Sequence, residues 1–257
     1  AADGFDLLLN YCADVKSSQA TSQSLQDKYD CDVVCVSGDI SQTKTRDKLF
    51  TEYDKNLKAT HDLSAIVHNA GQYVGITSQN GLGLKHEKIM AFGDGSILTK
   101  DGNVDLTQMH YYQKLYGDAY IDLCERGLAR MKYSGGSLVG ISSGGCTLHY
   151  RPSPGYDMPG TGKCTMEYAM RLFALRAGMR NVNCNVIIPG VTSTDAWENL
   201  SKIGGDKKMK QKLEKLSPMG GTCPLDIGKV VAFLCSSDGR PITGMSIPVD
   251  NGIHLKL

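Results

Sequence analysis

Short apolar runs alternate with longer amphipathic stretches along the whole chain. Six of these runs are only four to six residues long, and their apolar character is nearly continuous. Such runs are typical of strands that are covered on both faces, as in a parallel sheet. The predicted strands are Phe5–Asn10, Asp32–Ser37, Ala65–Asn69, Ser137–Ser142, Asn183–Ile188 and Ser246–Val249.

The stretches between these runs place apolar residues at helical spacing, and two of them are regular enough to predict helices. In Lys163–Gly178 the apolar stripe comprises Met166, Ala169, Met170, Phe173, Ala174 and Ala177. In Asp118–Met131 the stripe comprises Tyr120, Leu123, Cys124, Leu128 and Met131. The repeated order of strand and helix predicts an α/β fold, in which a parallel sheet with right-handed crossovers is covered by helices on both faces.

The chain has 257 residues, which suits one large α/β domain, so we expect residues 1–257 to form a single domain. One connection, Gln72–His110, is unusually long, and connections of this length are usually lids or insertions. Within it, Asp101–Asp105 resembles the start of a calcium loop. It lacks the glycine and the glutamate that complete such a loop, which favours a hairpin or turn.

Composition excludes several classes of function. The net charge is +1, so no basic field indicates a nucleic-acid partner. No apolar run approaches the ~20 residues that a transmembrane helix needs. The nine cysteines are scattered without a Cys-x2-Cys pair, which predicts no metal site and indicates reduced thiols in an intracellular, reducing compartment. Cytoplasm, plastid and mitochondrion all remain compatible with this pattern.

Polar or small residues follow four of the predicted strands. Ligands bind at the carboxyl ends of parallel strands, so these residues are the candidates for chemistry. Asp39 follows the second strand and Asn69-Ala70-Gly71 the third, while Ser143 ends the fourth. The fifth strand is followed by Pro189-Gly190, and then by Thr192 and Thr194.

These motifs, in this order, resemble the short-chain dehydrogenase/reductase family from Phe5 to Gly252. Pro224–Leu234 and Ile242–Gly252 are similar to the closing helix and strand of that family. The resemblance implies a Rossmann-like, doubly wound sheet that binds NADP or NAD. It also implies hydride transfer to a small-molecule substrate, either a carbonyl compound or an enoyl thioester.

The resemblance assigns a role to each candidate residue. Ser143 would steady the substrate oxygen, and Lys163 would hold the nicotinamide ribose. Lys163 would also favour the phenolate of a catalytic tyrosine, whose ordinary pKa is ~10. Asp39 would lie near the adenine, and Asn69, Ala70 and Gly71 would line the cofactor. Pro189, Gly190, Thr192 and Thr194 would grip the nicotinamide carboxamide, although each threonine could equally be a helix cap.

The catalytic tyrosine departs from the usual family spacing. Tyr-x3-Lys would place it at position 159, which is Pro159. Tyr156 gives Tyr-x6-Lys with Lys163, a spacing that resembles enoyl-thioester reductases, in which the tyrosine protonates an enolate oxygen. The separation of Ser143 from Tyr156 is also common in carbonyl reductases, so both chemistries remain open. Tyr150 is a second candidate.

Three further positions bear on the site. Lys114 aligns near the asparagine that the family often uses to support a proton-relay water. His68 precedes the Asn-Ala-Gly motif and is interpreted as a packed residue, not a base. Tyr11 stands where an acidic residue would favour NAD, which favours NADP slightly.

The resemblance also implies a first strand and a glycine-rich turn before Phe5, and neither is in the chain. Asn80–Gly83 has glycines but follows the wrong strand. We therefore expect the sequence to be an N-terminally incomplete copy of a longer chain, with an insertion at about 72–110.

Two functions are consistent with these observations. The first is an NAD(P)-dependent reductase that uses Ser143, Tyr156 and Lys163, with Gln72–His110 and Asp195–Ser217 as its substrate lid. The second is a catalytically impaired family member that serves as a structural or accessory subunit of a larger assembly. A protein that binds the cofactor without turnover lies between them. The resemblance further implies a homo-oligomer.

Overall fold

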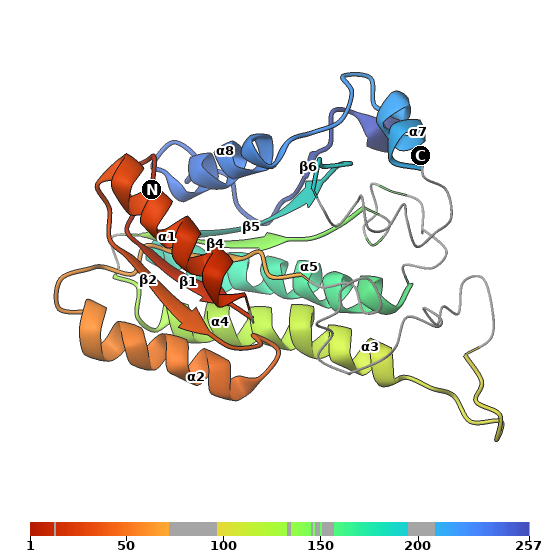
Figure 1. The fold of residues 1–257 in the computed structure, drawn as a ribbon, viewed down its shortest axis with the longest axis horizontal. Coiled ribbons are helices and arrows are strands. Elements are labelled where there is room, and N and C mark those ends of the chain that lie inside the picture. The colour runs from red at the N-terminus through yellow and green to blue at the C-terminus, as the bar shows by residue number, and fades with distance from the viewer. Residues whose placement is uncertain are drawn as a thin grey trace.

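Figure 1 shows the chain as a computed structural model. The structure describes residues 1–12, 14–71, 97–132, 135–144, 146, 150, 157–194 and 209–256.

All six predicted strands are present, and their ends lie within two residues of the predicted ones. Every ladder between them is parallel, and the strands point toward the end of the molecule where α3 and α7 lie (Figure 1). The strands are β1 (Leu7–Tyr11), β2 (Val33–Ser37), β3 (Ala65–His68), β4 (Gly136–Ile141), β5 (Val182–Pro189) and β6 (Ser246–Val249).

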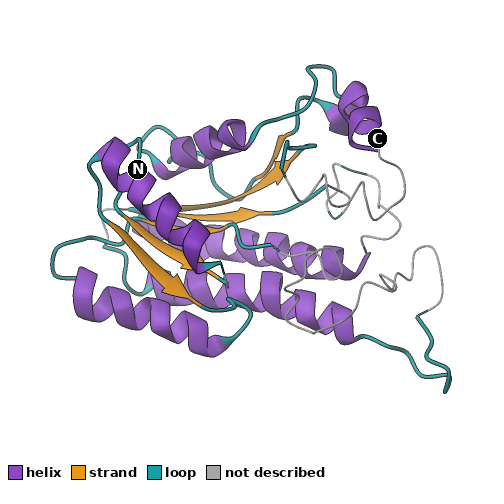
Figure 2. Cartoon of the chain, viewed as in Figure 1, coloured by secondary structure: helices purple, strands orange, loops and turns teal. Residues whose placement is uncertain are grey.

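Helices cover both faces of the strands, as predicted (Figure 2). α1 (Val15–Tyr29) and α8 (Pro224–Cys235) lie on one face. The other face is covered by α2 (Thr43–Glu52), α4 (Ala119–Leu128) and α5 (Asp157–Ala177). The remaining helical elements are α3 (Thr107–Tyr112), α7 (Met209–Leu216), the π-helices Tyr53–Leu57 and Gln113–Asp118 (η1 and η2), and the 3-10 turns Gly178–Arg180 and Ile253–Leu255 (η3 and η4).

Two helices are longer than the periodicity indicated. α5 begins at Asp157, not at Lys163, because Pro159 falls in its first turn, where a missing backbone N–H costs no hydrogen bond. α4 continues N-terminally through η2 into α3, so one helical segment begins at Thr107. The predicted connection Gln72–His110 therefore ends before Thr107, and residues 72–96 of it lie outside the described residues.

The core lies where the apolar stripes of α4 and α5 meet β4 and β5. Every stripe residue predicted for these two helices is buried. Tyr120, Leu138, Met166 and Met170 belong to this cluster and are almost completely inaccessible to solvent. On the opposite face, Leu234 of α8 packs against Ile187 and its neighbours. The prediction of a sheet covered on both faces is confirmed.

The strands do not form one continuous sheet. In the described part of the chain, β1 pairs only with β2, and β3, β4, β5 and β6 form a separate four-stranded sheet. The two sheets nevertheless share a core, because Leu8 and Val36 pack against the same apolar cluster as Ile66 and Ala70. The predicted parallel α/β fold is confirmed, and its strands are divided between two parallel sheets that are joined by side-chain packing.

The turn predicted at Asp101–Asp105 is confirmed. Leu98 and Val104 form an antiparallel bridge, and Gly102 has a positive φ of 76°. Glycine adopts this conformation without the steric cost of a Cβ atom. No helix within the described ranges has both the length and the apolar character needed to cross a membrane.

Candidate active site

Lys163 is the centre of the candidate site. It lies in the second turn of α5 and is only 5% exposed. Its ammonium donates a hydrogen bond to the carbonyl of Ile141 at the end of β4. The same nitrogen lies 3.9 Å from the centroid of the Tyr116 ring, a cation–π contact. α5 therefore places an amine directly beside the residues that follow β4.

The charge of Lys163 depends on a balance of opposing effects. Burial disfavours the ammonium and lowers the pKa of Lys163 to about 8, although Cys146 and Glu167 both act to raise it. At neutral pH the side chain is still mainly protonated. A lysine with this pKa can act as a cation near pH 7 and lose that charge at mildly alkaline pH.

Glu167, one helical turn after Lys163, is a residue that the sequence reasoning missed. It is 5% exposed and accepts hydrogen bonds from Ser142 Oγ at 2.5 Å and from Ser246 Oγ at 2.8 Å. These bonds tie α5 to the end of β4 and to the beginning of β6. An acidic residue on the predicted apolar face of α5, four positions after Lys163, was the available signal.

The other two predicted catalytic residues are Ser143 and Tyr156. Ser143 is half-buried and follows Ile141, the hydrogen-bond partner of Lys163, by two residues. Its carbonyl accepts a hydrogen bond from Cys146 Sγ at 2.8 Å. Tyr156 lies outside the described residues, and α5 begins at the next position. The assignments of Ser143 and Tyr156 as catalytic residues both stay predictions.

Tyr150, the second tyrosine candidate, occupies a different environment. Its hydroxyl donates a hydrogen bond to Asp250, and the side chain is buried. Burial, and then the neighbouring carboxylate, raise the pKa of Tyr150 well above its ordinary value. Although burial acts to raise the pKa of Asp250, hydrogen bonds from Tyr150 and His254 hold it below its usual range. Tyr150 therefore anchors Asp250, and its phenolate is strongly disfavoured.

His68 is confirmed as a packed residue. It is 2% exposed, and its Nε2 lies 2.9 Å from the carbonyl of Leu115, to which it donates as the Nε2–H tautomer. Burial, reinforced by the charges of Lys163 and Arg46, lowers the pKa of His68 to about 4. The ring is neutral at physiological pH and connects β3 to η2.

The alignment of Lys114 with the asparagine of the family stays a prediction. Lys114 is exposed on η2, and the residue of η2 that contacts Lys163 is Tyr116. The Tyr116 ring stacks on Tyr112 with a centroid separation of 5.8 Å. The π-helical geometry of η2 changes which side chains face α5.

The predicted cofactor-binding residues lie at the ends of the strands in the described structure. Asn69 and Gly71 are exposed, Ala70 and Asp39 are half-buried, and Asp39 accepts a hydrogen bond from the backbone of Ser41 at 2.9 Å. A Cβ added at Gly71 would meet no side-chain atom closer than the Tyr116 hydroxyl, at 3.7 Å. Among the described residues, Gly71 is thus adjacent to Tyr116, one of the partners of Lys163.

The segment after β5 packs closely against the segments that follow β6 and precede α8. A Cβ added at Gly190 would lie 2.6 Å from the Cα of Asp250, so only glycine allows this approach after Pro189. Thr192 is buried, and its hydroxyl lies 3.0 Å from that of Thr222. Thr194 is half-buried and donates weakly to the Thr192 carbonyl at 3.5 Å. Thr192 therefore joins the end of β5 to the segment before α8.

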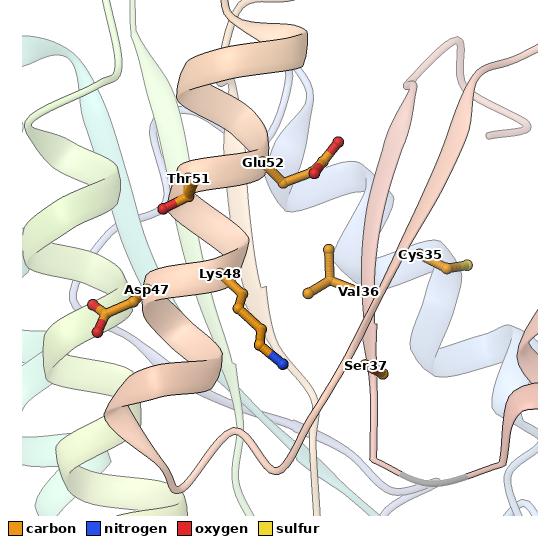
Figure 3. A pocket seen from close by; sticks show the side chains of 7 residues that line it. All are labelled: Cys35, Val36, Ser37, Asp47, Lys48, Thr51 and Glu52. Carbon is orange, nitrogen blue, oxygen red and sulfur yellow. The ribbon is translucent and has the colours of Figure 1, made fainter.

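A separate hollow of about 470 Å³ lies between β2 and α2. Figure 3 shows Lys48 and Glu52 extending from α2 toward Val36 of β2. None of its lining residues was predicted as a site residue. This hollow lies on the two-stranded sheet, whereas Lys163 and Ser143 lie beside the four-stranded one.

Comparison with known proteins identifies the family. A family model described as Enoyl-(Acyl carrier protein) reductase matches residues 1–254. The chain belongs to the short-chain dehydrogenase/reductase family. It is 22% identical to the short-chain dehydrogenase/reductase GME11373 of Pestalotiopsis microspora, over 97% of this chain and 86% of that protein.

Members of the family with different chemistries are similar to this chain. One relative is FabI of Synechocystis sp., an enzyme named enoyl-[acyl-carrier-protein] reductase [NADH]. The two sequences are 30% identical over 65% of this chain and 62% of that enzyme, so the match spans less than two thirds of the relative's length. The crystal structure of the angucycline C-6 ketoreductase LanV with bound NADP has a TM-score of 0.75 and 23% identity, and covers 97% of this chain and 86% of that one. These likenesses support the Rossmann-like fold of the family.

Proposed function

We propose that this short-chain dehydrogenase/reductase is an NAD(P)-dependent reductase that delivers a hydride to a carbonyl or enoyl-thioester substrate. The observation that carries the proposal is the buried Lys163. Its ammonium binds the carbonyl of Ile141, which precedes Ser143 by two residues, and lies over the Tyr116 ring, while the charge of Glu167 acts to keep it protonated. Burying a lysine is costly, and a strongly shifted pKa beside a strand end is typical of a functional site.

The residues present fit the nicotinamide end of a dinucleotide. The exposed backbone of Asn69 and Gly71 leaves room beside Tyr116, and Gly190 allows the ends of β5 and β6 to approach closely. Lys163 would hold the ribose, and Thr192 and Thr194 would line the carboxamide. When bound, the nicotinamide group supplies the hydride. Solved relatives carry NADP or NADPH and the FabI relatives are named for NADH, so both cofactors are proposed.

The chain's own residues would manage the oxygen of the substrate. Ser143 donates a hydrogen bond to that oxygen, and Tyr156 transfers a proton to it as negative charge develops. The Lys163 ammonium lowers the energy of the resulting phenolate. The same proton transfer serves an alkoxide from a carbonyl and an enolate from an enoyl thioester, so these residues alone support both substrates.

The proposal is tested by binding and turnover of the native, full-length protein. Fluorescence titration with NADPH and NADH is expected to give micromolar dissociation constants. Absorbance at the nicotinamide band then follows oxidation with a panel of ketones and a panel of enoyl thioesters. Binding without oxidation by either panel would identify a dinucleotide-binding protein. Absence of binding to a folded chain would favour the accessory-subunit alternative.

Replacing Tyr156 with phenylalanine is expected to lower kcat by about 10²–10³-fold, because the variant has no phenolic proton to transfer. Cofactor affinity should stay within a factor of two, since Tyr156 is proposed to act on the substrate. Tyr150→Phe is the matched control. It removes one hydroxyl that hydrogen-bonds Asp250, and its kcat is expected to stay within a few-fold of wild type. Loss of turnover in Tyr150→Phe but not in Tyr156→Phe would exchange their roles.

Replacing Glu167 with glutamine is expected to move the alkaline limb of the kcat/KM profile to lower pH. In the wild type this limb should fall near pH 8, where Lys163 loses its proton. The glutamine removes a negative charge that raises the pKa of Lys163, so the ammonium is lost at lower pH. Ser246→Ala, which deletes a hydrogen bond to Glu167 but keeps its charge, should leave the limb near pH 8. An unshifted limb in Glu167→Gln would contradict the electrostatic role.

We also propose that the protein is a homo-oligomer that assembles through α4 and α5. An exposed apolar stripe that runs along α5 into η3 supports this: Tyr168, Leu172, Leu175 and Met179 are at least half-exposed. Light scattering of the purified protein distinguishes this assembly from a monomer or from a subunit that requires another chain.

A further inference from the structure

Two cysteines meet beside Lys163. Cys146 lies in the segment after β4, and Cys164 directly follows Lys163 in α5. Cys164 Sγ donates to the backbone carbonyl of Cys146 at 2.9 Å, and when Cys164 is ionised its thiolate can accept a hydrogen bond from the Cys146 thiol. The pair therefore connects the segment that contains Ser143 to the turn of α5 that contains Lys163. Neither thiol has a part in the reaction proposed above.

The two thiols differ in a way that suits sequential oxidation. Cys164 is exposed, and the hydrogen bond from Cys146 lowers its pKa to about 7, so a large fraction is thiolate at neutral pH. Cys146 is half-buried, and the hydrogen bond with Cys164, together with burial, raises its pKa. Cys146 also donates to the Ser143 carbonyl at 2.8 Å. One sulfur is thus accessible and nucleophilic, and the other is protonated and in contact with it.

The remaining cysteines in the described residues lack this combination. Cys124 and Cys184 are buried, and burial raises the pKa of each thiol. Cys12 is exposed, but partial burial and the charge of Asp39 raise its pKa. Accessibility, thiolate character and a partner thiol coincide at Cys146 and Cys164.

We propose that Cys146 and Cys164 form a redox-active dithiol, which hydroperoxides convert into a disulfide across the candidate active site. In the first step the Cys164 thiolate attacks a peroxide oxygen. An S–O bond forms, the O–O bond breaks, and the leaving oxygen takes a proton to give water or an alcohol. The product is a sulfenic acid on Cys164.

In the second step the Cys146 thiol attacks the Cys164 sulfur. The S–S bond forms, the S–O bond breaks, and water leaves with the proton of Cys146. The two thiols supply the two electrons that reduce the peroxide. A dithiol reductant restores both thiols. In a reducing compartment, a dithiol of this kind is expected to respond reversibly to oxidants.

The disulfide would change the surroundings of Lys163. Cys146 would lose the thiol proton that it donates to Ser143, and the segment after β4 would be tied covalently to α5. We expect the oxidised protein to be inactive and the reduced protein to recover fully. This consequence for turnover rests on the proposed function, whereas formation of the disulfide does not.

The experiment treats the native, full-length protein with a small excess of hydrogen peroxide. Thiol titration is expected to show the loss of two thiols per chain, and mass spectrometry of the digested protein should find one peptide pair linked through Cys146 and Cys164. Dithiothreitol should reverse both changes. Cys146→Ser should instead retain a sulfenic acid on Cys164 that a dimedone probe captures. Cys164→Ser should form neither product, and Cys12→Ser should behave as the wild type does.

Circular dichroism checks that each variant is folded, and the wild-type measurement requires no variant. A folded wild-type protein that forms no link between Cys146 and Cys164, or that links other cysteines first, would overturn the proposal. Turnover is followed in the same samples. A reversible disulfide in a protein without turnover would leave the dithiol standing and remove the reductase proposal. A disulfide that leaves turnover unchanged would overturn the proposed inactivation.

Discussion

Replacing Lys163 with methionine is expected to reduce kcat/KM by at least about 10³-fold. Methionine has a similar length and no charge, so the variant removes the ammonium while largely filling its volume. The Ile141 carbonyl loses its donor, and Tyr116 loses its cation. Because Lys163 is proposed to hold the ribose and to favour the tyrosine phenolate, cofactor affinity and kcat should both fall.

The Lys163→Met prediction is measured by steady-state kinetics and by NADPH titration of the same preparation. Lys58→Met is the matched control, because Lys58 is exposed at the end of η1. It comes before the start of β3, and so lies away from the carboxyl ends of the strands, where the candidate site is. Its kinetics should equal those of the wild type. A folded Lys163→Met protein that retains more than about a tenth of the wild-type kcat/KM would remove Lys163 from the mechanism.

Replacing Arg46 with methionine is expected to lower the free energy of unfolding by about 3 kcal/mol. Arg46 lies in α2 and is 5% exposed. Its guanidinium pairs with Asp122 of α4, and also donates to the Ile40 carbonyl at 2.7 Å and to Thr43 Oγ1 at 3.0 Å. Methionine would leave the carboxylate of Asp122, which is three-quarters buried, without its main partner.

Arg46→Met is measured by urea unfolding, with Arg176→Met as the control. Arg176 also pairs with an acidic residue, Glu125, but both side chains of that pair are more than half exposed. Exposed ion pairs contribute less than about 1 kcal/mol, so the control should be close to the wild type. Equal losses in the two variants would show that burial does not decide the strength of the Arg46 pair. Because this pair joins α2 to α4, it also contributes to holding the two sheets together.

The six strands and the stripes of α4 and α5 were predictable from the sequence, because apolar periodicity is set by local geometry. A buried parallel strand needs apolar residues on both faces, and Leu138 to Ile141 satisfy this within one short run. The roles of Ser143 and Lys163 came from the resemblance that the order of the motifs indicated, and they stay predictions. The family followed from that order, and His68 was correctly interpreted as packed.

The start of α5 and the surroundings of Lys163 depended on contacts between residues that are distant in the sequence. Proline at position 159 is compatible with a loop or with a first helical turn, and only the packing of α5 decides for the helix. The π-helix η2 presents Tyr116 to Lys163, a contact between residues 47 positions apart that local periodicity does not indicate.

The sequence by itself therefore determined the fold class and the family, and it named Ser143 and Lys163 as candidates for the site. Only the tertiary structure decided how those groups are charged and what surrounds them. Burial lowers the pKa of Lys163 to about 8, against the opposing effects of Cys146 and Glu167. The Cys146–Cys164 contact joins two segments that are separate in the chain. Burial and through-space charge depend on three-dimensional proximity, which spacing along a sequence does not encode.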